Sequence, residues 1–218
     1  MFKNYIFDLD GTIINSSNEV LLCMERAFDK ANYVIDKSML TPNVIGPPIK
    51  QIIQTIAPDL SDENKINEII ANFRSFYDND EKDISEIYEG IYEVLENLKS
   101  QGCKLFIATF KPEKPTLRII EQFNLKYFED VYTIDKFKTH ITKEEMISQI
   151  IEKYNLDKSQ TVMIGDAKTD MTAAMAAGVM AVGALWGYGD DKQPLIDNAD
   201  ITIKEIKELC QKLNCQTT

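Results

Sequence analysis

The chain has 218 residues, with 24 lysines and arginines against 35 aspartates and glutamates, which gives a formal net charge of -11 at pH 7. This length is enough for a full hydrophobic core with an appendage beside it, and the negative charge disfavours nucleic acid and anionic membranes as general partners. The sequence has no run of 18 apolar residues, and aspartates interrupt its apolar N-terminal stretch, so we expect neither a membrane span nor a signal peptide, and a cytoplasmic location.

The first predicted element is a short buried strand that ends in two aspartates. Residues 5–7 and Leu9 form a nearly continuous apolar run, which is typical of a parallel strand covered on both faces. Asp8 and Asp10 lie at the carboxyl end of this run, where open α/β sheets bind ligands. Asp10-Gly11 is also a common turn dipeptide, so this stretch by itself leaves a functional site and a simple turn both open.

Residues 16–83 are predicted to form an all-helical insert. Apolar residues recur there at three- and four-residue spacing, with Ser16 or Ser17 as the candidate N-cap of the first helix. The insert contains 12 acidic and 7 basic residues, so it does not resemble a basic nucleic-acid module. Residues 14–15 and the polar stretch 78–83 are the expected linkers, and two linkers permit a hinge.

From residue 84 onward, predicted strands alternate with predicted helices. Strands are expected at residues 104–108, 131–134, 161–164, 181–182 and 201–203. Helices are expected at residues 94–98, 117–123, 146–154 and 171–177, followed by a final helix. The alternation predicts an α/β fold with a doubly wound, parallel, Rossmann-like sheet, to which residues 1–15 and 84–218 contribute the core.

Polar residues lie next to several of these predicted elements. Thr109 ends one strand, Lys143 precedes a helix, and Gly-Asp-Ala-Lys-Thr-Asp at residues 165–170 follows another strand. The aspartates that would converge at the sheet edge are Asp8, Asp10, Asp166 and Asp170. Like charges about 4 Å apart repel by roughly 4 kcal/mol at an effective dielectric of 20, so such a cluster needs a cation. An all-oxygen site favours Mg²⁺.

The order of these segments resembles the haloacid dehalogenase superfamily. Its members carry DxDGT after a first strand, as at residues 8–12, then a threonine after a strand, a lysine, and GDxxxD after a strand, as at residues 165–170. The insert after Asp10 resembles the helical cap of phosphoglycolate-phosphatase-like members. The resemblance implies a magnesium-dependent phosphatase that acts on a small phosphomonoester. Dehalogenation would need Asp8 alone, so the second aspartate favours phosphoryl transfer.

The resemblance also implies roles for individual residues. Asp8 would attack phosphorus to form an aspartyl-phosphate, while Asp10 would protonate the leaving group and then deprotonate water. Thr109 would bind a transferring phosphoryl oxygen, and Lys143 would offset charge on Asp8 and the phosphate. The implied Mg²⁺ ligands are the carboxylates of Asp8 and Asp166, the backbone carbonyl of Asp10, and Asp170 as an assisting group.

Some of these assignments have ordinary alternatives in the sequence. Thr109 could be a plain strand terminus and Lys143 a solvated lysine, with Lys136 and Lys138 as competitors for its role. Phe110 stands where related sequences often carry serine or asparagine, which makes it a candidate for substrate contact.

Two residues of the insert are candidates for the non-reacting end of the substrate. They are Lys50 and Arg74, with solvated helix cations as the alternative reading. The four cysteines lack CxxC spacing and are expected to be ordinary thiols. His140 is the only histidine, which excludes a multi-histidine metal site.

The leading hypothesis is therefore a phosphatase, but other functions remain open. A 5'-nucleotidase, a pyrophosphatase and a phosphomutase are the enzymatic alternatives. A receiver-like signalling domain also uses strand-tip aspartates, but it would be much shorter and would lack the helical insert. We expect a monomer or homodimer whose partner is a small phosphorylated metabolite.

Overall fold

The computed structural model describes residues 2–79, 84–137 and 141–213. Lys138, His140, Cys215 and part of the predicted linker 78–83 lie outside the described residues. The chain divides into two compact units. The α/β unit comprises Met1–Asn15, Ile87–Gly187 and Asp191–Thr218, and the helical unit comprises Ser16–Glu86 and Tyr188–Asp190.

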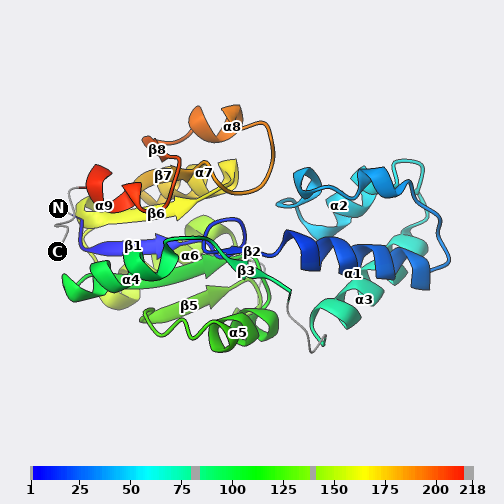
Figure 1. The fold of residues 1–218 in the computed structure, drawn as a ribbon, viewed down its shortest axis with the longest axis horizontal. Helices are drawn as coiled ribbons and strands as arrows, with labels where there is room; N and C mark the ends of the chain where they lie inside the picture. Colours follow the sequence, from blue (N-terminus) through cyan, green and yellow to red (C-terminus); the bar gives the residue numbers. More distant parts are fainter. Residues whose placement is uncertain (1, 80–83, 138–140, 214–218) are drawn as a thin grey trace. The chain divides into compact units, whose positions relative to one another are not determined.

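The α/β unit is built on a six-stranded, all-parallel sheet with the strand order β5-β4-β1-β6-β7-β8 (Figure 1). The strands are β1 (Asn4–Phe7), β4 (Lys104–Thr109), β5 (Asp130–Thr133), β6 (Thr161–Gly165), β7 (Met180–Ala184) and β8 (Ile201–Ile203). The chain moves from β1 through β4 to β5, then returns to the other side of β1 for β6, β7 and β8. The strand order thus reverses beside β1, and such switch points are where open α/β sheets bind ligands.

Helices cover both faces of this sheet, as the predicted doubly wound fold requires (Figure 1). The helices are α4 (Ile91–Ser100), α5 (Glu113–Gln122), α6 (Lys143–Tyr154), α7 (Lys168–Ala177), α8 (Gln193–Ile196) and α9 (Glu208–Lys212). Tyr5 and Phe7 pack in a core with α4 and α9, whereas Ile6 packs in a second core with α6 and α7. This alternation explains the continuous apolar run of β1, because each face of the strand is buried.

The helical unit has its own apolar core. It contains α1 (Ser17–Lys30), α2 (Ile49–Ile56), α3 (Glu63–Tyr77) and the short 3-10 helices η1 (Lys37–Met39) and η2 (Pro42–Val44). The described unit extends to Glu86, three residues beyond the predicted insert, and takes in Tyr188–Asp190, which the sequence did not assign to it.

Hydrogen bonds explain why Tyr188–Asp190 belongs to the helical unit. Ser16 occupies the predicted N-cap position of α1, and its backbone N donates to Tyr188 Oη at 2.7 Å. The Ser16 hydroxyl lies 2.8 Å from the same phenol oxygen. Asn43 Nδ2 donates to Asp190 Oδ2 at 2.6 Å, and Asp190 N donates to Asn43 Oδ1 at 3.1 Å. Ser16 thus bonds to a residue far along the chain.

Short strands occur where the chain leaves and re-enters the α/β unit. They are β2 (Ile14–Asn15) and β3 (Glu86–Ile87), which pair as a separate two-stranded sheet. The sequence pattern predicted a linker at the first place and no strand at the second. Strands of two residues are too short to show a hydrophobic period, so the pattern has no signal for them.

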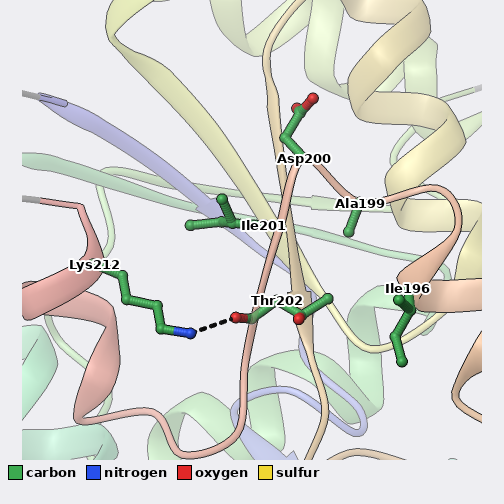
Figure 2. Close-up of a pocket in the computed structure, with 6 residues that line it drawn as sticks. All are labelled: Ile196, Ala199, Asp200, Ile201, Thr202 and Lys212. Atoms are coloured by element: carbon green, nitrogen blue, oxygen red, sulfur yellow. Dashed lines mark hydrogen bonds between the residues drawn. The ribbon is translucent and has the colours of Figure 1, made fainter.

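The outer strand β8 borders an open hollow of about 490 Å³. Figure 2 shows its lining, which is Ile196, Ala199, Asp200, Ile201, Thr202 and Lys212. Lys212 Nζ donates to Thr202 O at 2.9 Å, so a lysine side chain satisfies a backbone carbonyl group of this edge strand. None of the four predicted site aspartates, Asp8, Asp10, Asp166 and Asp170, is among the described residues that line the hollow. Among the described helices, none is long and apolar enough to cross a membrane.

Candidate active site

A tight loop after β1 sets the position of Asp8. Asp8 N donates to Ile164 O at 2.9 Å, which continues the pairing with β6 beyond the end of the strand. The chain then turns, with Gly11 N bonded to Ile14 O at 2.8 Å. Gly11 has φ +78, and a Cβ there would lie 2.2 Å from Asp166 Oδ2. Both the turn and the close approach of Asp166 therefore require glycine.

The acidic motif after β6 brings two more carboxylates to the same place. Asp166 Oδ1 accepts a hydrogen bond from Thr12 Oγ1 at 3.3 Å. Asp170 is fully buried in the first turn of α7, where its Oδ2 accepts from Ala167 N at 3.0 Å. Asp170 thus satisfies the helix N-terminus, the ordinary role for an acid there, and in addition faces the site.

Asp8, Asp166 and Asp170 form a compact group of carboxylates. Each offers one oxygen, and the three oxygens lie within 4.8 Å of one another. Burial raises the pKa of Asp8 from 3.8 to about 7; the nearby Lys143 opposes this rise, and Asp170 adds to it. The three carboxylates and the single ammonium of Lys143 leave an excess of negative charge in a buried place. All the atoms that could bind a metal ion there are oxygens. These residues therefore fit a hard divalent cation such as Mg²⁺.

The first residue of α6, Lys143, reaches this group of carboxylates. Lys143 Nζ lies 2.9 Å from Asp8 Oδ2 and 2.5 Å from Asp170 Oδ1, and its side chain is 4% exposed. Burial disfavours its charge, but the carboxylates of Asp170 and Asp8 raise its pKa above the usual 10.5. Its competitor Lys136 instead binds Asp130, with Nζ 2.8 Å from Oδ1. Of the described candidates, Lys143 is the lysine that lies among the predicted acids.

Asp10 occupies a different position from the other three aspartates. Its side chain remains 24% exposed, and its Oδ1 lies 3.1 Å from Lys111 Nζ. The carboxylate is not part of the three-acid group, and a metal contact through the backbone carbonyl of Asp10 stays a prediction. Thr109 ends β4, and its Oγ1 accepts from Lys111 N at 3.1 Å.

The predicted substrate contacts lie in both units. Phe110 is 39% exposed, and Lys143 Nζ lies 5.0 Å from the centre of its ring, a cation–π distance. Lys50 belongs to the helical unit, where its Nζ forms an ion pair with Glu63 at 2.8 Å. Arg74 is exposed on α3. The contacts of these three residues with substrate stay predictions.

Sequence reasoning missed three residues around Asp166, which are Gly187, Trp186 and Tyr88. A Cβ on Gly187 would lie 2.2 Å from Asp166 Cβ, so the loop after β7 packs directly on this carboxylate. Trp186 Nε1 donates to Thr12 O at 3.0 Å, and the Trp186 ring contacts Tyr88 edge to face. Burial and the charges of Asp166 and Asp10 raise the pKa of Tyr88 above 10. The glycines at 187 and 189 were visible in the sequence but fit a simple turn equally well.

Comparisons with known proteins place the chain in a family. A family model of haloacid dehalogenase-like hydrolases matches residues 5–184. Phosphoglycolate phosphatase of Vibrio parahaemolyticus is 28% identical over 219 residues, which cover 96% of this chain and 95% of that protein. Tyrosine-protein kinase PtkA of Mycobacterium tuberculosis is 26% identical over 199 residues, which cover 91% of this chain and 66% of that protein.

A solved structure extends the likeness to the whole fold. A predicted phosphatase from Clostridium acetobutylicum is 27% identical with a TM-score of 0.83, and the match covers 98% of this chain and 99% of that one. The family resemblance and the fold class expected from the sequence are thereby confirmed. The chain is an enzyme of the haloacid dehalogenase-like hydrolase family.

Proposed function

We propose that this protein is a magnesium-dependent phosphatase that hydrolyses a small phosphomonoester through an aspartyl-phosphate on Asp8. The proposal depends on one observation above all, which is the buried Asp8 carboxylate beside the Lys143 ammonium and two further carboxylates. The phosphatase relative is matched over 95% of its own length, whereas the kinase relative is matched over 66% of its own length. This difference favours hydrolysis over transfer to a protein tyrosine.

In the first step, a carboxylate oxygen of Asp8 forms a bond to phosphorus while the bond from phosphorus to the leaving oxygen breaks. Asp10 donates a proton to that oxygen, so the product leaves as an alcohol. The oxygen of Thr109 already accepts from Lys111 N, so its hydroxyl hydrogen can be donated to a phosphoryl oxygen. Lys143 offsets the negative charge that Asp8 and the phosphoryl group bring together.

In the second step, Asp10 takes a proton from water as the water oxygen bonds to phosphorus. The bond between phosphorus and Asp8 then breaks, which releases inorganic phosphate and restores both carboxyl groups. Asp10 must exchange protons with two different oxygens, and its partly exposed side chain suits this role better than the buried Asp170 does.

A divalent cation explains how the nucleophile stays ionised. Burial raises the pKa of Asp8 to about 7, so a large fraction would be protonated at neutral pH without further positive charge. Bound Mg²⁺ would favour the anion and polarise a phosphoryl oxygen as a Lewis acid. Asp8, Asp166 and Asp170 would hold it through their carboxylates.

The test is release of inorganic phosphate from 4-nitrophenyl phosphate and from a panel of metabolites that includes phosphoglycolate, nucleoside monophosphates and pyrophosphate. We expect activity with Mg²⁺ that is lost in excess EDTA, and an acid-stable radiolabelled phosphoenzyme in rapid-quench samples. Asp8→Asn should abolish both, whereas the exposed Asp59→Asn should change neither. Undiminished turnover in EDTA or by Asp8→Asn would contradict the proposal. Isomerised sugar phosphate without free phosphate would indicate a phosphomutase.

A further inference from the structure

Lys111 is a buried cation for which the proposed mechanism has no role. Its side chain is 1% exposed and ends 3.1 Å from Asp10 Oδ1. A buried ammonium is costly unless it is paired and hydrogen-bonded, so this side chain needs a carboxylate at the end of its path. The pair joins two segments far apart in sequence, the loop after β1 and the turn after β4.

The turn that carries Lys111 is itself well anchored. Lys111 N donates to Thr109 Oγ1 at 3.1 Å, so one residue contacts both Thr109 and Asp10. The following residues are tied by a bond from Glu113 N to Asp135 Oδ1 at 2.8 Å and a bond from Thr116 Oγ1 to Pro112 O at 2.7 Å. A lysine held on such a turn can fix the side chain that it binds.

We propose that Lys111 is a positioning residue that holds the Asp10 carboxyl group in line with the leaving oxygen of the substrate. This inference rests on the proposed function, in which Asp10 protonates that oxygen. Asp10 is partly exposed, and an ion pair with a buried lysine narrows the range of rotamers that its carboxyl group samples. A carboxylic acid keeps an acceptor oxygen when it is protonated, so the bond from Lys111 can persist in both protonation states.

The burial of Lys111 argues against direct binding of a substrate anion. An ammonium whose side chain is 1% exposed cannot reach the far end of a metabolite without leaving Asp10. Its effect is therefore expected through Asp10, and it should matter most where proton donation limits the reaction. Alkyl phosphates need a proton on the leaving oxygen, whereas 4-nitrophenolate departs well without one.

The experiment compares Lys111→Met, Lys111→Arg and the unchanged protein on 4-nitrophenyl phosphate and on an alkyl phosphate such as glycerol 1-phosphate. For Lys111→Met we expect kcat/KM to fall about 30-fold on the alkyl phosphate and at most about 3-fold on the aryl phosphate, because imperfect placement of a general acid forfeits part of its 10²–10⁴-fold effect. Lys111→Arg keeps a cationic donor and should recover a large part of the alkyl activity.

A double-mutant cycle separates positioning from folding. Asp10→Asn should itself lower kcat/KM selectively on the alkyl phosphate, because kcat/KM covers the steps up to departure of the leaving group and not the later hydrolysis of the intermediate, which both substrates share. Adding Lys111→Met should then cause no further selective loss in kcat/KM. The positioning role would be overturned if Lys111→Met left the ratio of kcat/KM for the two substrates unchanged, whether through equal losses or no loss. It would also be overturned by a rise in KM with unchanged kcat. The proposed function and this inference would be overturned together if the wild-type protein released no phosphate or if the Asp8→Asn variant remained active.

Discussion

Gly187→Ala tests whether the loop after β7 positions Asp166. An added Cβ would lie 2.2 Å from Asp166 Cβ and 2.4 Å from its Oδ2, whereas ordinary contact begins at 3.4 Å. The loop or the carboxylate must therefore move by about 1.2 Å. Gly187 is not among the described glycines with positive φ, so alanine adds no backbone strain and the effect is steric. A misplacement of about 1 Å at a catalytic group can cost about 100-fold in rate.

We therefore expect Gly187→Ala to lower kcat/KM for 4-nitrophenyl phosphate by about 100-fold, through a weakened response to Mg²⁺. The assay is a Mg²⁺ titration of initial rates, with thermal unfolding measured in parallel, where overpacking should cost about 1–3 kcal/mol. Gly189→Ala is the matched control, because its Cβ meets nothing within 4 Å and only its φ of +77 is unfavourable. A Gly187→Ala variant with the normal Mg²⁺ midpoint and rate would refute the reasoning.

Three further predictions follow from the described contacts. Asp10→Asn should slow turnover strongly and leave the midpoint of the Mg²⁺ titration nearly unchanged, whereas Asp166→Asn should shift that midpoint. Similar shifts of the midpoint in both variants would contradict the separate positions of the two carboxylates. If Lys50 or Arg74 binds a substrate anion, its alanine variant should lose about 1.5–3 kcal/mol in kcat/KM on the natural substrate and little on 4-nitrophenyl phosphate; equal losses on both would indicate a damaged fold. Partial burial opposes ionisation of Asp130, but hydrogen bonds from two lysine side chains lower its pKa from 3.8 to about 2. The ionised Asp130 therefore stabilises the folded protein fully above pH 3.8, and this contribution is lost as the pH falls to about 2. In urea unfolding, Asp130→Asn should thus cost about 1 kcal/mol at pH 7, after allowance for solvent screening, and this difference should shrink between pH 4 and pH 2; a constant difference would refute the link to ionisation.

The strands and their acidic tips were predictable because they depend on local patterns. The apolar run of residues 5–7 follows from burial on both faces of β1, and Asp8 and Asp166 follow directly after neighbouring strands. Lys143 was harder to choose, since by sequence it is one of several lysines near a helix start. Its burial beside Asp8 depends on the packing of α6, which no local pattern encodes.

The residues that were missed make contacts between segments that are distant in sequence. Lys111 meets Asp10 across 101 positions of sequence, and Gly187 meets Asp166 from a loop that resembles an ordinary turn. A lone lysine or glycine carries no sign of such a contact. Ser16, one of the two N-cap candidates, occupies that position at the start of α1, but its hydrogen bonds to Tyr188 depend on a loop more than 170 residues away.

The bonds of Tyr188 and Asp190 also bear on how this protein can be recombined with its relatives. A chimaera that exchanged residues 16–86 alone would take Ser16 and Asn43 from one parent and their partners from the other. Exchange of residues 16–86 together with 188–190 would keep the four hydrogen bonds within one parental set. The natural module for exchange is thus discontinuous in sequence, and substitutions in its two segments are expected to be coupled.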